Sequence, residues 1–457
     1  MDLIVRGGRV VLEQGSFDLD VGIADGRIAA LSAPGGGHAR DEINVSGCFV
    51  MPGFIDAHTH FKLPFCGTVT ADDFRSGTRA AAMGGVTTII DFANPPAGGA
   101  ILAPVRRRLG EMVNECHVDY SVHASACGMC ETSLDEFEQV VAMGVTSLKL
   151  FMTYRREGRI THDGWLFKYL EKARELDALI TVHAENDEII AALIEEYRRC
   201  GLLSAPYHGR SRPSFSEAEA IARACAIAGG AGGRLHIVHM TTAGGATAVE
   251  RARIDGVRVT CETCPQYLVL DESRFAGLHG HRYATCPPLR PAADVEGLWR
   301  GIETGVVDMV ATDHCVFTAA QKDAWGGDFT AIPYGIPGVE TMAPVFLEAS
   351  RRRGGLPQAR LVSMLSTNPA RIFGLYPRKG SILPGADADI VVLDPRVSWR
   401  IDPDHLATPC DWSPYTGYQV TGRITHVLLR GGFLVRDGEF IDDSRRGMLL
   451  PRAGGTA

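Results

Sequence analysis

Two histidines one residue apart, His58 and His60, stand at the end of an apolar run in the stretch GFIDAHTHF, residues 53–61. In an extended strand residues i and i+2 point to the same side, so both imidazoles would face one way. Two neutral imidazoles side by side suit a divalent metal. The alternative is two polar residues at a strand end, and this motif alone leaves both interpretations open.

Four other residues that could serve a metal site lie in or end apolar runs elsewhere in the chain. Lys149 lies in SLKLFM, His183 in LITVHA and His239 in LHIVHM, and Asp313 ends VVDMVATD. A lone histidine at a strand end is usually a packed or surface residue. Four histidines and an aspartate at equivalent positions are much harder to explain by chance, and together they predict a metal site.

Lys149 is the unexpected member of this set, because a lysine ammonium would repel a metal. In apolar surroundings such as SLKLFM the pKa of a lysine falls, and the neutral amine becomes available. A neutral amine can react with carbon dioxide to form a carbamate, which is a carboxylate able to bridge two metals. A salt-bridged lysine is the alternative that the residues alone leave open.

The elements that must position these residues alternate between strands and helices. Helical patterns such as SLDEFEQVVAM lie between most of the strand candidates. Eight such units predict a closed parallel (β/α)8 barrel, whose working residues lie at the carboxyl ends of the strands. A doubly wound open sheet is the alternative, but no Gly-rich phosphate loop follows the first strand. The strand candidates are residues 54–60, 87–92, 118–125, 147–152, 179–184, 235–240, 257–263 and 306–313.

Both ends of the chain differ from this middle part and resemble each other. The first fifty residues are short alternating strands with glycine turns, including a hairpin signal, DG, at 25–26. The last eighty residues repeat this texture in GSILPGADADIVVLDP and ITHVLLRGGFLVRDGEFI. We therefore expect an α/β protein in which residues 1–51 and 376–457 form a small β-sandwich domain beside a barrel over residues 52–375.

Composition excludes several classes of partner. The net charge is −8, and the short RRR runs at 106–108 and 351–353 sit in helical patterns, so a nucleic-acid surface is not expected. Neither a membrane-spanning stretch nor a signal peptide is evident, and the expected location is the cytoplasm. The twelve cysteines are expected as thiols. The CxxC pairs at 127–130 and 261–264 lie too far apart for a zinc ribbon.

The set DAHTHF, SLKLFM, TVHAEN, IVHM and ATDHC resembles the amidohydrolase superfamily. More narrowly it resembles the cyclic amidases of the hydantoinase and dihydropyrimidinase type, with support from ETCPQYL, PPLR and GSILPGADADIVVLDP. The likeness covers nearly the whole chain. It implies a (β/α)8 barrel with a flanking β-sandwich, two zinc ions per subunit with manganese or cobalt as possible substitutes, and a homotetramer or homodimer.

The resemblance also implies how the metals would be held. One metal would be bound by His58, His60 and Asp313, and the other by His183 and His239. A carboxylated lysine, N6-carboxylysine, would bridge both metals together with a hydroxide, and its place in the chain is that of Lys149.

Further residues match the family's catalytic and substrate-binding positions. Tyr154, in FMTYR, corresponds to the tyrosine that donates to the developing oxyanion, and Asp313 would shuttle the proton to the leaving nitrogen. Cys286 and Tyr334 fall where the family usually has serine and asparagine, residues that hold the cyclic imide largely through backbone groups.

The exocyclic substituent of the substrate would need an apolar pocket. Leu63, Phe65, Phe151 and Tyr154 are apolar or aromatic and lie near the motifs, so they could line it, although barrel packing would explain them too.

These observations predict a hydrolase that opens the ring amide of 5-substituted hydantoins or dihydropyrimidines to N-carbamoyl amino acids. An allantoinase or an L-hydantoinase would share the metal set but generally lacks an equivalent of Tyr154. A dihydroorotase would need a dedicated arginine in the pocket, and the sequence indicates none. A non-catalytic relative of dihydropyrimidinase would have lost metal ligands, whereas every ligand position is filled here.

Overall fold

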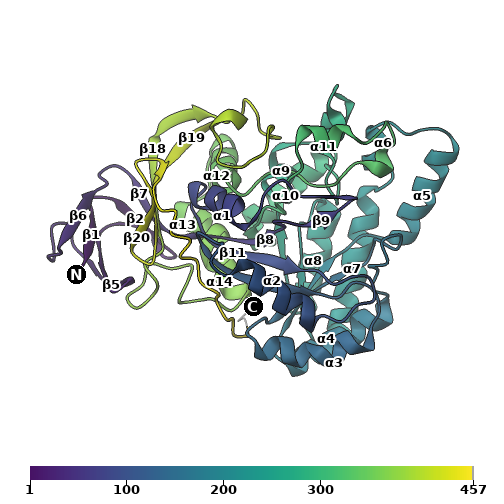
Figure 1. Ribbon diagram of the computed structural model, residues 1–457, viewed down its shortest axis with the longest axis horizontal. Helices are drawn as coiled ribbons and strands as arrows, with labels where there is room; N and C mark the ends of the chain where they lie inside the picture. Colours follow the sequence, from purple (N-terminus) through teal and green to yellow (C-terminus); the bar gives the residue numbers. More distant parts are fainter. Residues whose placement is uncertain (455–457) are drawn as a thin grey trace.

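Eight parallel strands form the central sheet of this computed structural model, which describes residues 1–454 (Figure 1). Their order, β17-β16-β15-β14-β13-β12-β11-β8, follows the sequence without a crossover. The strands are β8 (Phe54–Thr59), β11 (Val86–Ala93), β12 (Asp119–Ser125), β13 (Ser147–Phe151), β14 (Leu179–His183), β15 (Arg234–Ile237), β16 (Val259–Thr263) and β17 (Met309–Val310).

The sheet closes on itself where the first strand meets the segment after the last one. Thr59 pairs in parallel with His314. The backbone N–H of His60 donates to the carbonyl oxygen of His314 at 2.8 Å. The N–H of His314 in turn donates to the carbonyl oxygen of His58 at 3.3 Å. The hydroxyl of Thr312 also donates to Asp56 in β8. The (β/α)8 barrel predicted from the sequence is therefore confirmed.

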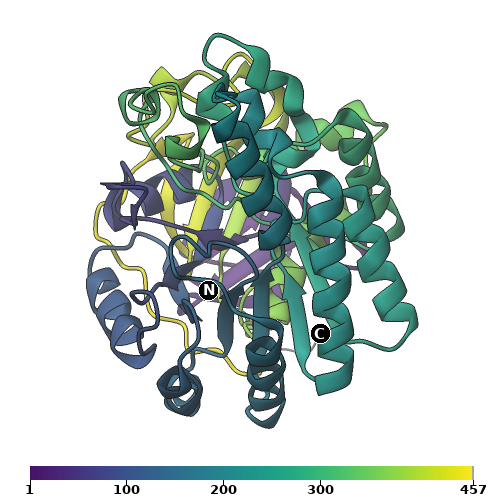
Figure 2. The same cartoon turned by 90° about the vertical axis from the view of Figure 1, so that its right-hand side faces the viewer.

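Helices surround the barrel and bury the outer faces of its strands. Every residue of β11 and β13 is buried, and apart from Asp91, Ser147 and Lys149 these residues are apolar or β-branched. Figure 2 shows the helices standing around the strands. Among residues 1–454 the helices include none that is both long and apolar enough to cross a membrane. They are α1 (Phe74–Met83), α2 (Leu102–Met112), α3 (Glu131–Ala142), α4 (Asp163–Glu175), α5 (Asp187–Arg199), α6 (Pro206–Arg210), α7 (Ser214–Ala231), α8 (Ala243–Ile254), α9 (Pro265–Val269), α10 (Ala292–Thr304), α11 (Ala319–Asp323), α12 (Met342–Arg352), α13 (Gln358–Val362) and α14 (Asn368–Ile372).

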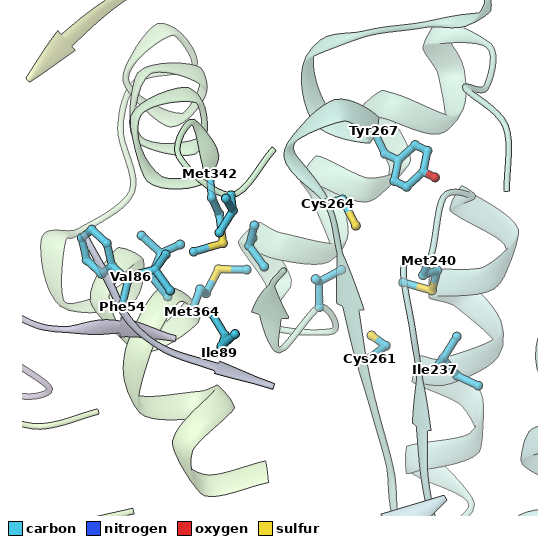
Figure 3. Packing of buried hydrophobic residues seen from close by; sticks show 14 of the residues in the cluster. Phe54, Val86, Ile89, Ile237, Met240, Cys261, Cys264, Tyr267, Met342 and Met364 are labelled. Atoms are coloured by element: carbon cyan, nitrogen blue, oxygen red, sulfur yellow. The ribbon is translucent and has the colours of Figure 1, made fainter. Parts of the chain in front are cut away.

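The apolar core accounts for one of the two CxxC pairs. Cys261 and Cys264 are fully buried in the same hydrophobic cluster as Ile237 and Met240 (Figure 3). A buried thiol behaves as a small apolar side chain, so this pair contributes packing.

Two further sheets combine both ends of the chain. One has the order β5-β4-β1-β6, and the other has the order β21-β20-β19-β18-β7-β2-β3. In the second sheet β7 pairs in parallel with β2 and antiparallel with β18, so early and late segments are neighbours. The proposed division into two domains stays a prediction. These strands are β1 (Leu3–Arg6), β2 (Arg9–Leu12), β3 (Gly15–Asp18), β4 (Asp20–Ala24), β5 (Arg27–Ser32), β6 (Asp41–Asn44), β7 (Phe49–Pro52), β18 (Ile390–Arg400), β19 (Gln419–Leu429), β20 (Gly432–Arg436) and β21 (Glu439–Phe440).

After β21 the chain returns to the barrel, as the yellow segment in Figure 1 shows. The N–H of Gly447 donates to the carbonyl oxygen of Cys116 at 3.0 Å, and that of Leu450 donates to Tyr120 at 2.8 Å. The buried guanidinium of Arg452 donates to the hydroxyl of Ser147 at 2.9 Å. This tail therefore belongs to the packing of the barrel.

Candidate active site

The barrel strands deliver the predicted metal ligands to one end of the barrel. His58 lies in β8, Lys149 in β13, and His183 ends β14. The prediction that His239 and Asp313 also end strands is wrong, because β15 stops at residue 237 and β17 at residue 310. Both residues have positive φ, 37° and 52°, which a strand cannot contain. Such strained backbone is common at functional sites.

A first group of three ligand candidates meets around one carboxylate. The Nε2 atoms of His58 and His60 lie 3.2 Å and 3.1 Å from Oδ1 of Asp313. One ligand atom from each residue lies within 4.8 Å of the others, a spacing that a single ion can bridge. Burial acts to raise the pKa of Asp313, but the two neighbouring imidazoles outweigh it and hold the pKa below its ordinary value. The carboxylate is therefore ready to bind a cation.

A second pair of imidazoles adjoins the first group. The ring centroids of His183 and His239 are 4.6 Å apart, and those of His58 and His239 are 5.2 Å apart. Burial lowers the pKa of His60, His183 and His239 below that of an ordinary histidine. These imidazoles are therefore neutral, the form that binds metals.

Lys149 is buried beside these histidines without a hydrogen-bond partner for its amine. Its Nζ lies 5.6 Å from the ring centroid of Phe92 and 5.4 Å from that of Phe151. Burial lowers the pKa of this amine to about 7, so a large fraction is neutral near neutral pH. The salt-bridged alternative finds no support, since no carboxylate among residues 1–454 forms an ion pair with Lys149.

The donor set fits a metal centre. Three buried nitrogen atoms of the site have no hydrogen-bond partner within the described chain: Nδ1 of His60, Nδ1 of His239 and Nζ of Lys149. Unsatisfied buried polar atoms are rare, and several in one cluster indicate that another group completes them. Neutral imidazoles and a carboxylate are ligands that zinc and similar ions prefer.

Two glutamates that the sequence analysis did not single out orient the histidine rings. Nδ1 of His58 lies 2.5 Å from Glu262, and Nε2 of His183 lies 2.7 Å from Glu185. Burial acts to raise the pKa of both glutamates. His58 and other neighbours nevertheless hold the pKa of Glu262 below its ordinary range, and Arg212 and other neighbours do the same for Glu185. A carboxylate behind a ligating histidine fixes its tautomer and orientation. Both glutamates lie in motifs quoted above, ETCPQYL and TVHAEN, so a signal was present.

All twelve predicted site residues line one cavity that is partly open to solvent. Tyr154 follows β13 with a φ of 68°, and burial raises the pKa of its hydroxyl well above its ordinary value. The hydroxyl is therefore a donor at neutral pH. The cavity contains His58, His60, Leu63, Phe65, Lys149, Phe151, Tyr154, His183, His239, Cys286, Asp313 and Tyr334.

The same cavity holds residues that the sequence did not indicate. Phe92, Asn94 and Cys315 contribute to its wall, and so does Arg159. The sequence indicated no arginine for this pocket, whereas Arg159 lines it. Arg159 lies in the irregular segment between β13 and α4, where no periodic pattern shows which side chains point inward.

Residues 49–434 match the sequence model of the amidohydrolase family. The chain belongs to the amidohydrolase family. Membership implies a binuclear metal centre, which agrees with the cluster of imidazoles, carboxylate and unpaired amine described above.

Similar proteins extend along the whole chain. A D-hydantoinase from Streptomyces coelicolor is 39% identical over 98% of both chains. A D-phenylhydantoinase from Escherichia coli is 38% identical over 99% of this chain and 98% of its own. The crystal structure of a dihydropyrimidinase from Brevibacillus agri superimposes with a TM-score of 0.97 at 35% identity, and each chain is completely covered. The resemblance to D-hydantoinase inferred from the motifs is thus confirmed.

Proposed function

We propose that this protein hydrolyses the ring amide of 5-substituted hydantoins or dihydropyrimidines and releases N-carbamoyl amino acids. The observation that carries the proposal is the convergence of four histidines, Asp313 and the unpaired amine of Lys149 beside Tyr154 in one cavity. The full-length similarity to proteins named D-hydantoinase and D-phenylhydantoinase supports the same reaction.

The metal centre would hold two divalent ions per subunit, zinc in the first place and manganese or cobalt as substitutes. When bound, the ions supply a Lewis acid and lower the pKa of a water molecule to about 7. The proposed ligands are His58, His60 and Asp313 for one ion, His183 and His239 for the other, and Lys149 for both.

Lys149 would serve as N6-carboxylysine. Its neutral Nζ forms an N–C bond to carbon dioxide and loses one proton, which leaves a carbamate with a single negative charge. Burial favours this step because it lowers the pKa of the amine to about 7. The apolar surroundings of Phe92 and Phe151 offer the ammonium form no compensating carboxylate at ion-pair distance.

Two side chains of the cavity would move or hold protons during ring opening. Asp313 accepts a proton from the attacking water at a carboxylate oxygen and delivers it to the leaving ring nitrogen. The Tyr154 hydroxyl donates a hydrogen bond to the carbonyl oxygen as negative charge develops there. The raised pKa of Tyr154 keeps its proton in place throughout.

The remaining cavity residues would hold the substrate ring and its substituent. The backbone groups at Cys286 and Tyr334 are proposed to bind the cyclic imide. Leu63, Phe65 and Phe151 are proposed to surround the exocyclic substituent and exclude water from it.

A panel of cyclic ureides tests the proposal. Hydantoin, resolved D- and L-5-substituted hydantoins, dihydrouracil and allantoin are incubated with purified protein, and N-carbamoyl products are measured by mass spectrometry. We expect hydrolysis of hydantoins or dihydrouracil, and loss of that activity in Asp313→Asn. Turnover of allantoin alone would favour the allantoinase alternative, and preference for L-hydantoins would favour the L-hydantoinase alternative. Absence of hydrolysis in metal-loaded protein would overturn the proposal.

The assembly and the location stay predictions. A homotetramer or homodimer is expected, and light scattering during size-exclusion chromatography at micromolar concentration measures it. Cytoplasmic action is likewise a prediction, and fractionation of the source cells would test it.

A further inference from the structure

Arg159 stands on the wall between the metal cavity and an outer groove. It lines both spaces, and the groove continues outward along Cys66 and Glu157. The Cζ atom of Arg159 lies 5.8 Å from the ring centroid of Phe65 and 6.0 Å from that of Phe151. The centroid of the same Phe151 ring lies 5.4 Å from Nζ of Lys149, so the ring lies between Arg159 and the proposed metal site. Arg159 is thus one aromatic ring away from the reacting centre.

The backbone of Arg159 is held in place by the elements around it. Its N–H donates to the carbonyl oxygen of Tyr154 at 3.0 Å, and its own carbonyl oxygen accepts from the N–H of Gly128 at 3.0 Å. Thr161, two residues later, donates to Phe151 at 2.7 Å. The arginine therefore belongs to a fixed loop that also carries the proposed oxyanion donor.

The guanidinium of Arg159 makes no hydrogen bond or ion pair with any residue between 1 and 454. Two other arginines near the site are paired: Arg155 lies 2.9 Å from Asp187, and Arg212 lies 2.7 Å from Glu185. Glu157 lines the same outer groove, but its carboxylate does not pair with the guanidinium of Arg159. A permanent cation with five donors and two aromatic neighbours is left without a counter-ion in the wall of the pocket.

We infer that the substrate carries a carboxylate at the end of a short exocyclic chain, and that this carboxylate pairs with Arg159. The inference rests on the proposed function. A guanidinium binds a carboxylate through two parallel hydrogen bonds, and the partly desolvated setting strengthens them. Because Phe151 separates Arg159 from Lys149, the anion is placed on a side chain of the ring substrate and not directly on the ring. The product is then the N-carbamoyl derivative of an acidic amino acid.

Two isosteric substrates test the inference: 5-(2-carboxyethyl)hydantoin and 5-(2-carbamoylethyl)hydantoin. In the wild type we expect kcat/KM to favour the acid by on the order of 10- to 100-fold, the usual effect of one charged hydrogen-bonded pair. Arg159→Gln should remove this preference by lowering kcat/KM for the acid far more than for the amide. Arg159→Lys should keep part of it, because the charge remains and the paired geometry is lost. Added salt should reduce the preference.

Arg155→Gln is the matched control, since Arg155 lies in the same loop but pairs with Asp187 and Glu188 outside the cavity. Its preference for the acid should equal that of the wild type. Equal turnover of acid and amide by the wild type, or a parallel loss of both in Arg159→Gln, would overturn the inference. A stronger preference for a carboxylate placed directly on the ring would overturn the proposed side-chain position.

Failure of the proposed function gives a different result. In that case unsubstituted hydantoin and dihydrouracil also remain intact. Calorimetric titration of the same acid and amide into the wild type and Arg159→Gln then tests the anion preference by binding alone. Tighter binding of the acid that disappears in the variant supports the role of Arg159, and equal binding overturns it.

Discussion

At the scale of single residues, the amine of Lys149 has the largest expected effect on the metal centre. As an ammonium it would face two dications in a poorly solvated site, which is strongly unfavourable, whereas a carbamate reverses the sign of the charge. We expect Lys149→Ala to lose both bound metal and activity, as measured by elemental analysis and turnover. Carbon-13 NMR after incubation with labelled bicarbonate should show a carbamate signal in the wild type that the variant lacks.

Lys322 is the matched control for Lys149. It is also buried, and burial also lowers the pKa of its amine to about 7, but its Nζ donates to the carbonyl oxygens of Ala284 and Pro333. Lys322→Met should therefore keep its metal content. Full metal content and near-normal turnover in Lys149→Ala would show that the bridge is another residue.

The hydroxyl of Tyr154 is expected to act only when negative charge develops on the substrate. Tyr154→Phe should lower kcat on the order of 10²- to 10³-fold, with metal content unchanged. Tyr197→Phe on α5, outside the cavity, should leave kcat as it is. A variant with normal kcat and a raised KM would instead assign Tyr154 to substrate binding.

Sequence alone singled out the ligand candidates because each lies in or shortly after a barrel strand. The spacing of His58 and His60 follows the two-residue period of a strand, Lys149 lies within an apolar run, and His183 ends β14. Arg159 could not be found in this way. Its direction depends on the contacts of its backbone with Tyr154 and Gly128, which lie in loops without any periodic signal.

At the scale of elements, the strand prediction was correct in number and order, but it was too long at the end of β15 and at the last strand. Residues 306–313 were expected to be extended, whereas β17 contains only Met309–Val310. Thr312 donates to Asp56, and Asp313 turns into a left-handed conformation. These tertiary contacts override the local apolar pattern, and they are what brings the Asp313 carboxylate to the histidines.

A buried carboxyl group just before α12, that of Glu340, has a pH-dependent effect on stability. Glu340 accepts a hydrogen bond from the N–H of Ala407 at 2.8 Å, and burial raises the pKa of its carboxyl to about 8. Because the folded state holds this proton more tightly than the unfolded chain, its contribution to stability is complete below about pH 4.5 and is lost as the pH rises towards 8.

Glu340→Gln should therefore be more stable than the wild type at pH 8.5, by on the order of 1–3 kcal/mol, and should show little or no gain at pH 4.5. Thermal unfolding at both pH values measures the difference. Glu303→Gln, at an exposed position on α10, should show no such pH dependence. Parallel pH profiles for wild type and Glu340→Gln would contradict the expectation.

At the scale of the whole molecule, a buried lysine joins the barrel to the terminal sheets. Nζ of Lys379 donates to Asp119, the first residue of β12, at 2.6 Å, and to Asp389, next to β18, at 2.7 Å. Asp387 lies 3.1 Å away. Burial acts to lower the pKa of Lys379, but the three carboxylates outweigh it and raise the pKa. The ammonium group of Lys379 therefore pairs with a carboxylate of the barrel and with carboxylates beside the terminal sheet.

Lys379→Met should lower the free energy of unfolding by about 3–5 kcal/mol, because it leaves buried carboxylates without their cation. Denaturant unfolding gives this value. Arg378→Met removes a cation that also pairs with Asp387 but is 41% exposed, so its effect should stay within about 1 kcal/mol. Equal effects of the two substitutions would show that burial of the ion pair is not decisive.

The pairing of β7 with β18 also determines when the protein can finish folding on the ribosome. β7 ends at residue 52 and β18 begins at residue 390. Roughly 340 residues must be translated between them, which takes roughly 20–70 s at about 5–20 residues per second. Until then the backbone N–H and C=O groups of β7 that pair with β18 have no partner, and this edge of the strand can pair wrongly. Residues 9–52 are thus made early, and their sheet is completed late.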